Sequence, residues 1–255
     1  MKTRYKIFKE NEFETWKYRF TWRGLYGDKA YYAINILRFF KEKPDLLEVL
    51  RSVRNVRTFR EKLAKLAKEY VKWANEIEPH TDDELNDLKK FFIGGIGEFF
   101  FTGLFNDVKA ILKIENGVEY RYDFNYTAPR LIGEDDWGVD LTSIVSDIHG
   151  DRNCVVQVKF WNPYIKSTID MDIAASAFTD GVLNNFINPE EEKNIVICWL
   201  GDEEKEVSMF LKKNECLYKH VIFIGKQSLN LTINEKNGIF WDSLVDKLHE
   251  LASKY

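Results

Sequence analysis

Apolar and polar residues alternate along residues 118–126, a period of two that is typical of a half-buried β-strand. Residues 108–115 precede this run, and Asn116-Gly117 joins the two segments. This pair favours a type I′ turn, because both of its residues tolerate positive φ. The pattern therefore predicts an antiparallel hairpin. The apolar positions of its second strand are Val118, Tyr120, Tyr122, Phe124 and Tyr126.

Two further runs of apolar, β-branched residues, 141–145 and 154–160, predict a second antiparallel hairpin. The polar segment between them contains Gly150, a residue that is common in turns. The chemistry of interest lies at the open end of this hairpin, where Asp140 precedes the first strand and Gln157 and Lys159 lie in the second.

The register of the second hairpin decides which side chains meet. If its turn is centred near residues 149 and 150, Asp140 lies opposite Lys159 and Thr142 lies opposite Gln157. Side chains two residues apart share a face of a sheet, so Asp140, Gln157 and Lys159 are expected on one face. This register is an assumption, and a bulge or a one-residue slip would break the pairing.

Longer apolar segments predict the rest of an α/β core. Residues 194–200 and 221–225 are almost continuously apolar, which is typical of buried strands. Apolar residues recur at helical spacing over 169–182 and 240–251, and residues 203–213 can form a short helix. The expected order is helix, antiparallel strands, helix, strand, helix, strand, helix.

A helix is expected from about residue 82 to residue 104, and Glu98 lies well inside it. Thr81 and Glu84 have the spacing of a capping box ahead of the apolar positions. Glu98 is flanked by Ile96 and by three phenylalanines at 99–101. Burial of a carboxylate among such residues is costly without a partner or a metal, which favours a functional role for Glu98.

Residues 1–80 have a helical pattern without a convincing strand, and we expect them to form a region separate from residues 81–255. Residues 1–90 carry 21 Lys and Arg against 15 Asp and Glu, whereas the remainder carries 16 against 26. A helix over 45–73 would expose a basic stripe to solvent or to phosphate. Its members are Arg51, Arg54, Arg57, Lys62, Lys65, Lys68 and Lys72. An aromatic cluster at residues 16–32 is interpreted as core.

The cysteines and the N-terminus point to an intracellular, soluble protein, which we expect to be cytoplasmic. Cys154 and Cys198 lie in predicted strands and Cys216 is isolated, so all three are interpreted as reduced thiols rather than zinc ligands. The N-terminus lacks the apolar stretch of a signal peptide, and no segment reaches the length of a membrane span. No membrane partner is expected.

The residue types at the open end of the second hairpin suit a hard divalent cation. Asp140, the side-chain oxygen of Gln157 and a neighbouring backbone carbonyl, that of Val158, offer the oxygen ligands that Mg²⁺ or Mn²⁺ takes. Lys159 would orient water or stabilise negative charge on a reacting phosphate. The acids at 134–136 are either further contributors, Asp136 first among them, or solvated loop residues.

These residues resemble the PD-(D/E)xK nuclease superfamily and, within it, the Mrr-like restriction endonuclease branch. The matching elements are the helical Glu98, Gly138-Val139-Asp140 at a strand start, and Gln157-Val158-Lys159. The resemblance implies that Asp140, Gln157 and Glu98 bind the metal and that Lys159 is the catalytic lysine. Gln157 departs from many relatives, which carry Asp or Glu at this position.

The resemblance implies a Mg²⁺- or Mn²⁺-dependent DNA endonuclease with a restriction, DNA-defence or DNA-processing role. It also implies a restriction-endonuclease-like core, a mixed β-sheet flanked by helices, in residues 81–255. The expected partners are DNA, a second copy of the chain, and a helicase or methyltransferase. The alternative is a nuclease-fold DNA-binding module of a larger complex that cleaves weakly or not at all, since Gln157 lowers the charge of the site.

Overall fold

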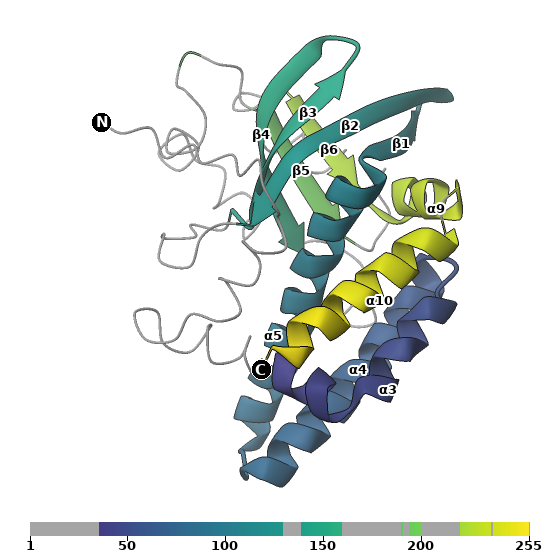
Figure 1. Cartoon of the computed structure of the whole chain (residues 1–255). Helices are drawn as coiled ribbons and strands as arrows, with labels where there is room; N and C mark the ends of the chain where they lie inside the picture. The colour runs from purple at the N-terminus through teal and green to yellow at the C-terminus, as the bar shows by residue number, and fades with distance from the viewer. Residues whose placement is uncertain are drawn as a thin grey trace.

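A mixed β-sheet lies against a layer of helices in this protein (Figure 1). The structure is a computed structural model and describes residues 36–129, 139–159, 190, 194–199, 220–235 and 237–254. In the described chain the sheet has six strands in the order β1-β2-β3-β4-β5-β6. Strands β1 to β4 are antiparallel, whereas β4, β5 and β6 are parallel, so the predicted mixed α/β class is confirmed.

The strands follow the predicted apolar runs closely. Asn116 and Gly117 have φ values of 51° and 78°, the two positive values that a type I′ turn needs, so the predicted first hairpin is confirmed. All residues of β5 are buried, as expected for a strand covered on both faces. The strands are β1 (Ala110–Glu115), β2 (Val118–Pro129), β3 (Leu141–Asp147), β4 (Gly150–Lys159), β5 (Asn194–Trp199) and β6 (His220–Ile224).

The predicted register of the second hairpin is wrong by two residues. Asp147 pairs with Gly150 and Thr142 pairs with Val155, so Thr142 does not face Gln157. The turn consists of Ile148 and His149, one residue earlier than assumed, because Gly150 takes a positive φ of 104° at the start of β4. Moving the turn centre by one residue changes every pairing in the hairpin by two.

Helices on one side of the sheet bring together segments that are far apart in the sequence. One cluster of buried apolar residues includes Ile36, Phe59, Phe100 and Trp241 together with residues of the sheet. The described helical segments, besides residues 36–42, are α3 (Pro44–Glu48), η1 (Val49–Ser52), α4 (Val56–Ile77), α5 (Asp82–Gly103), the π-helical η2 (Leu104–Val108), α9 (Lys226–Glu235) and α10 (Asn237–Ser253).

The helix expected over residues 45–73 is interrupted, which is a correction. The structure has α3, a short 3-10 turn and then α4, which begins after Asn55. The Asn55 side chain accepts a hydrogen bond from the Thr58 N–H, and the Thr58 hydroxyl accepts one from the Asn55 N–H. This capping box starts a new helix inside a segment whose apolar spacing alone suggested continuity.

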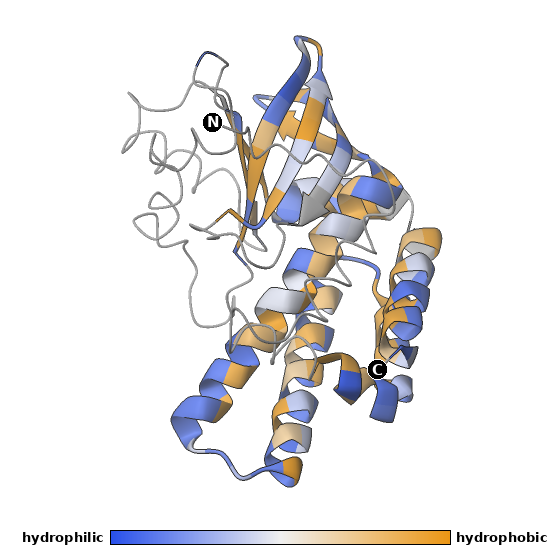
Figure 2. Cartoon of the chain, turned by 60° about the vertical axis from the view of Figure 1, so that its left-hand side comes forward, coloured by the Kyte–Doolittle hydropathy of each residue, from blue (hydrophilic) through white to orange (hydrophobic). Residues whose placement is uncertain are grey.

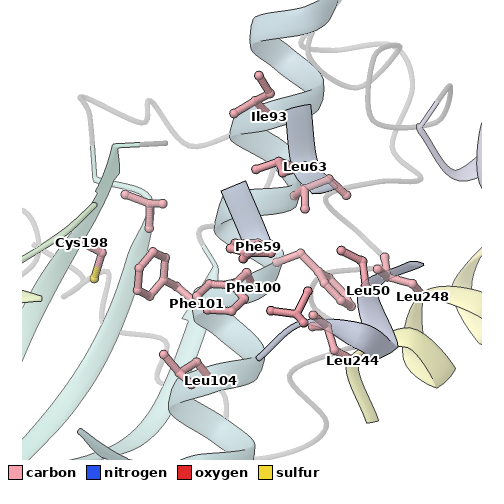
Figure 3. Packing of buried hydrophobic residues seen from close by; sticks show 14 of the residues in the cluster. Leu50, Phe59, Leu63, Ile93, Phe100, Phe101, Leu104, Cys198, Leu244 and Leu248 are labelled. Carbon is pink, nitrogen blue, oxygen red and sulfur yellow. The ribbon is translucent and has the colours of Figure 1, made fainter. Parts of the chain in front are cut away.

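Helix α5 confirms its predicted start and passes between the sheet and the other helices. Glu84 Oε2 accepts from the Thr81 N–H at 2.8 Å, as the capping box requires. Farther along, the ring of Phe100 stacks on Phe59 of α4, with centroids 4.7 Å apart (Figure 3). It also stacks on Trp241 of α10, with centroids 5.5 Å apart. These rings fix α5 firmly against its neighbours.

Helix α9 was not predicted, and it covers the edge of the sheet. Its buried side includes Ser228 and Thr232 beside Leu229 and Ile233, so the segment lacks a continuous apolar stripe. The Thr232 hydroxyl accepts a hydrogen bond from the Leu112 N–H of edge strand β1 at 3.1 Å. This contact satisfies a backbone donor that would otherwise invite pairing with another strand.

The basic stripe of the N-terminal helical segment divides into two parts. Arg51 is not available for phosphate, because its guanidinium binds the carboxylates of Glu48, Asp242 and Asp246 at 2.6–3.0 Å. Arg57, Lys65, Lys68 and Lys72 of α4 remain exposed. Helices α4 and α5 run side by side, and the loop that joins them, far from the sheet, is hydrophilic (Figure 2).

Several predicted features lie outside the described residues. These are the helices at 169–182 and 203–213, the aromatic cluster at 16–32, the acids at 134–136 and Cys216. Cys154 and Cys198 are buried free thiols, as expected, and burial raises the pKa of Cys154 to about 12. Among the described helices, none combines the length and apolar character required to cross a membrane.

Replacement of Arg51 by methionine should destabilise the protein, since Arg51 joins η1 to α10. We expect the free energy of unfolding to fall by about 1–2 kcal/mol, the sum of several partly exposed ion pairs. Arg57→Met is the matched control, because Arg57 is 85% exposed and pairs only locally with Glu61. Urea unfolding followed by tryptophan fluorescence measures both changes. Equal stability of the two variants would contradict this assignment.

The same comparison has an expected pH dependence. Hydrogen bonds from Arg51 and His249 lower the pKa of Glu48 below its ordinary value. A lowered pKa in the folded state gives stability that is present above the ordinary pKa and is lost as the pH falls through the folded-state pKa. The difference between Arg51→Met and wild type should therefore shrink in acid.

Candidate active site

Asp140 is bound to β4 through both its backbone and its side chain. Its backbone N–H donates to the Val156 carbonyl at 3.0 Å, and its carboxylate Oδ2 accepts from the Val158 N–H at 2.7 Å. Leu141 also pairs with Val156, so two consecutive residues face one residue of β4, as in a β-bulge. In a continued β3, a backbone carbonyl would accept the hydrogen bond from the Val158 N–H. The Asp140 carboxylate takes the place of that carbonyl.

This arrangement corrects the predicted neighbours of Asp140. The carboxylate does not lie opposite Lys159 in a regular ladder but bonds to the backbone between Gln157 and Lys159. The register differs from the predicted one by two residues, so each side chain of the hairpin keeps its predicted face of the sheet. The bulge, by contrast, turns the Asp140 side chain towards the end of β4. Asp140 therefore meets the Gln157-Val158-Lys159 segment, although by a different route from the predicted one.

Gln157 and Lys159 project from the face of the sheet opposite α5. Val156 and Val158 belong to the core cluster that includes α5, and side chains alternate along a strand. Gln157 is fully buried and pairs with Ile197 of β5, whereas Lys159 is partly exposed and pairs with Trp199. The amide is thus inside the fold, while the ammonium group can reach the surface at the carboxyl end of β4.

Glu98 approaches the same end of the sheet from α5. Phe105 stacks on Phe124 in the middle of β2, with centroids 4.1 Å apart. One turn earlier, Phe101 lies on the side of α5 that faces Cys198 of β5 (Figure 3). Cys198 pairs with Val158, near the end of β4. Another turn earlier on this side of the helix is Glu98, which is half-buried. Helical spacing therefore directs Glu98 towards the end of the sheet that carries Asp140.

The donor types at this end fit a magnesium or manganese ion. Carboxylate, amide and backbone carbonyl oxygens are all hard ligands, and a carboxylate oxygen that accepts one hydrogen bond retains a second lone pair. Within the described part of the chain, no three His, Cys, Asp or Glu residues form a group that could hold a metal. A set built on Asp140 and Gln157 differs from such a group, because it uses an amide and backbone carbonyl oxygens.

A pair of buried hydroxyl groups near the site was not anticipated. Thr127 Oγ1 and Ser143 Oγ are 2.7 Å apart, and both residues are buried. The two residues join the end of β2 to β3, and Ser143 lies three residues after Asp140. The sequence carried no local signal of this pair, because Thr127 and Ala128 continue the alternation that begins at Val118.

Comparison with known proteins identifies no relative. No family model matches the chain, and no curated protein or solved structure gives a significant match. The functional interpretation therefore rests on the residues and on their geometry.

Loss of the Asp140 side chain should reduce stability even without metal. In EDTA, Asp140→Ala leaves the Val158 N–H without its acceptor, which costs about 1–3 kcal/mol of unfolding free energy. Asp140→Asn retains an oxygen acceptor and should cost clearly less. Asp151→Ala, at the exposed turn end of β4, is the control and should be nearly neutral. If the Ala and Asn variants unfold at the same urea concentration, the side-chain hydrogen bond does not support β4.

Proposed function

We propose that this protein is a metal-dependent nuclease that hydrolyses phosphodiester bonds in DNA. One observation carries the proposal: the carboxylate of Asp140 is held against the backbone between Gln157 and Lys159 by the 2.7 Å hydrogen bond from Val158. The acid thus lies beside the strand segment that carries the amide and the lysine, at one end of a rigid sheet. Preorganised charged groups of this kind stabilise charge that develops during a reaction.

The architecture supports the resemblance on which the proposal also draws. A restriction-endonuclease-like core is a mixed sheet flanked by helices. Here α5 precedes the antiparallel strands β1 to β4, and β5 then adds in parallel to β4. The element order is the one expected if α5 supplies Glu98 and the β3–β4 hairpin supplies the remaining residues.

Asp140, Gln157 and Glu98 are the residues that would hold Mg²⁺ or Mn²⁺; because Gln157 projects from the face of the sheet opposite α5, Glu98 would have to reach the ion around the end of β4. The bound ion would supply Lewis-acid activation of water and neutralisation of phosphate charge. Asp140 is oriented for this role by Val158, and Gln157 is fixed by complete burial. Glu98 provides a second negative charge, which the site needs because Gln157 is neutral.

Lys159 would act on the substrate electrostatically. Its position at the end of β4, partly exposed, allows its ammonium group to contact a phosphate or to orient a water molecule. A fixed cation beside buried strands stabilises phosphate charge more strongly than a solvated one does. The expected restriction or DNA-processing role, and the expected dimer, helicase or methyltransferase partners, come from the resemblance alone.

A DNA-binding module without turnover is the second candidate function. It is favoured by the structural hydrogen bond that Asp140 already makes and by the neutral, fully buried Gln157. Both features weaken a metal site relative to one with two exposed acids. Cleavage and binding measurements separate the two candidates.

Wild-type protein should nick supercoiled plasmid DNA with Mg²⁺ or Mn²⁺ and should not do so in EDTA. Lys159→Ala and Asp140→Asn should each reduce the rate at least about 100-fold, since each removes a group that acts in the transition state. The control is Lys90→Ala, because Lys90 is an exposed lysine on the outer side of α5. Nicking that survives both site substitutions would exclude this site. DNA binding without nicking by wild type would favour the binding module.

Gln157→Glu should strengthen metal binding while weakening the metal-free fold. A second carboxylate raises affinity for a divalent cation, but a buried charge without a counterion is destabilising. We therefore expect a lower melting temperature in EDTA and a larger rise with Mn²⁺ than wild type shows. Differential scanning fluorimetry over a Mn²⁺ titration measures both. An equal Mn²⁺ response in the two proteins would argue against Gln157 as a ligand position.

A further inference from the structure

Tyr126 has a backbone conformation that is unfavourable for a bulky residue. Its φ is 53°, in the left-handed region that non-glycine residues rarely adopt. Two other non-glycine residues of the described chain have positive φ, and both have ordinary explanations: Asn116 lies in a hairpin turn and Lys109 ends η2. Tyr126 instead lies inside strand β2.

A β-bulge accounts for the position of Tyr126. Asn125 pairs with Ile144, but the next pair is Ala128 with Thr142, so β2 has one extra residue at positions 126 and 127. Bulges of this kind re-aim side chains next to functional sites. The bulge directs Tyr126 outward enough to leave it 43% exposed, while Thr127 is buried.

Hydrogen bonds hold this bulge in place. The Ser143 hydroxyl lies 2.7 Å from Thr127 Oγ1 and donates to the Asn125 carbonyl at 3.0 Å. The Asn106 side chain donates to the Thr127 carbonyl at 3.1 Å from η2. The irregular backbone on either side of Tyr126 is therefore supported by groups from three elements, as expected where strain serves a purpose.

The bulge lies close to the proposed active site. Ala128 pairs with Thr142 and Pro129 with Leu141, the residue that follows Asp140. With a strand spacing of about 4.8 Å and a rise of about 3.3 Å per residue, the backbone of Tyr126 is about 11 Å from that of Asp140. This is the span of one to two nucleotides.

We infer that Tyr126 is a positioning residue whose ring stacks on an unpaired nucleobase beside the phosphate that is cut. The inference rests on the proposed nuclease function and names its substrate as a single-stranded or locally unpaired DNA segment. An exposed tyrosine on a rigid strand offers a flat surface at low entropic cost, and stacking on aromatic rings is the common way to hold unpaired bases. Stacking tolerates any base, so it would add affinity without sequence preference.

The test compares binding of two fluorescein-labelled oligomers of twelve residues in EDTA, one of thymidine nucleotides and one abasic, with equal phosphate charge. Wild type should bind the thymidine oligomer about 5- to 100-fold more tightly, the range expected for one stacked base. Tyr126→Gly should bind both oligomers equally, and Tyr126→Phe should keep the wild-type preference. Fluorescence anisotropy provides the affinities.

The glycine variant also controls for folding. Glycine adopts positive φ without strain, so Tyr126→Gly should melt at or above the wild-type temperature while losing the base preference. Retention of the preference by Tyr126→Gly, or its absence in wild type, would overturn the inference; the second result is also expected if Tyr126 instead contacts a protein partner. Plasmid nicking is scored separately. If the protein nicks plasmid DNA but Tyr126 has no effect on base preference, only the stacking role of Tyr126 is rejected. If the base preference depends on Tyr126 but no nicking occurs, only the proposed nuclease activity is rejected.

Discussion

The packing of aromatic rings around α5 is the constraint on which the rest of the structure depends. The rings of Phe100, Phe59 and Trp241 pack against one another, and Phe105 stacks on Phe124 of the sheet. Complete burial of each such ring contributes roughly 1.5–3 kcal/mol, and the ring geometry adds about 0.5–1.5 kcal/mol per pair. Because these contacts set how far α5 extends along the sheet, they also determine where Glu98 stands relative to the ends of β3 and β4.

Around the start of β3, regular pairing gives way to two irregularities. Asp140 and Leu141 both face Val156, and β2 has an extra residue at Tyr126. Each irregularity redirects a side chain that a regular ladder would place elsewhere. Polar groups inside the fold support both, through the Val158 N–H in one case and the Thr127–Ser143 pair in the other. A rigid sheet can hold such departures, which is why candidate functional side chains gather there.

Sequence patterns predicted the features that local chemistry determines. The capping box at Thr81, the turn at Asn116-Gly117 and the buried run of β5 each follow from a few adjacent residues. Tertiary contacts decided the rest. The Asp140 bulge needs the Val158 N–H as a partner, and α9 is joined to β1 through the buried hydroxyl group of Thr232. The break at Asn55 had a local signal in its capping box, but the apolar spacing across it concealed that signal.

The proposed nuclease function requires that Asp140 and the neighbouring β4 residues hold a divalent cation. Anomalous X-ray scattering from crystals soaked in Mn²⁺ tests it most directly. We expect a peak beside the Asp140 carboxylate at the end of β4, near the oxygen atoms of Gln157 or Val158. A peak elsewhere, or none at a Mn²⁺ concentration that saturates any DNA cleavage, would contradict it.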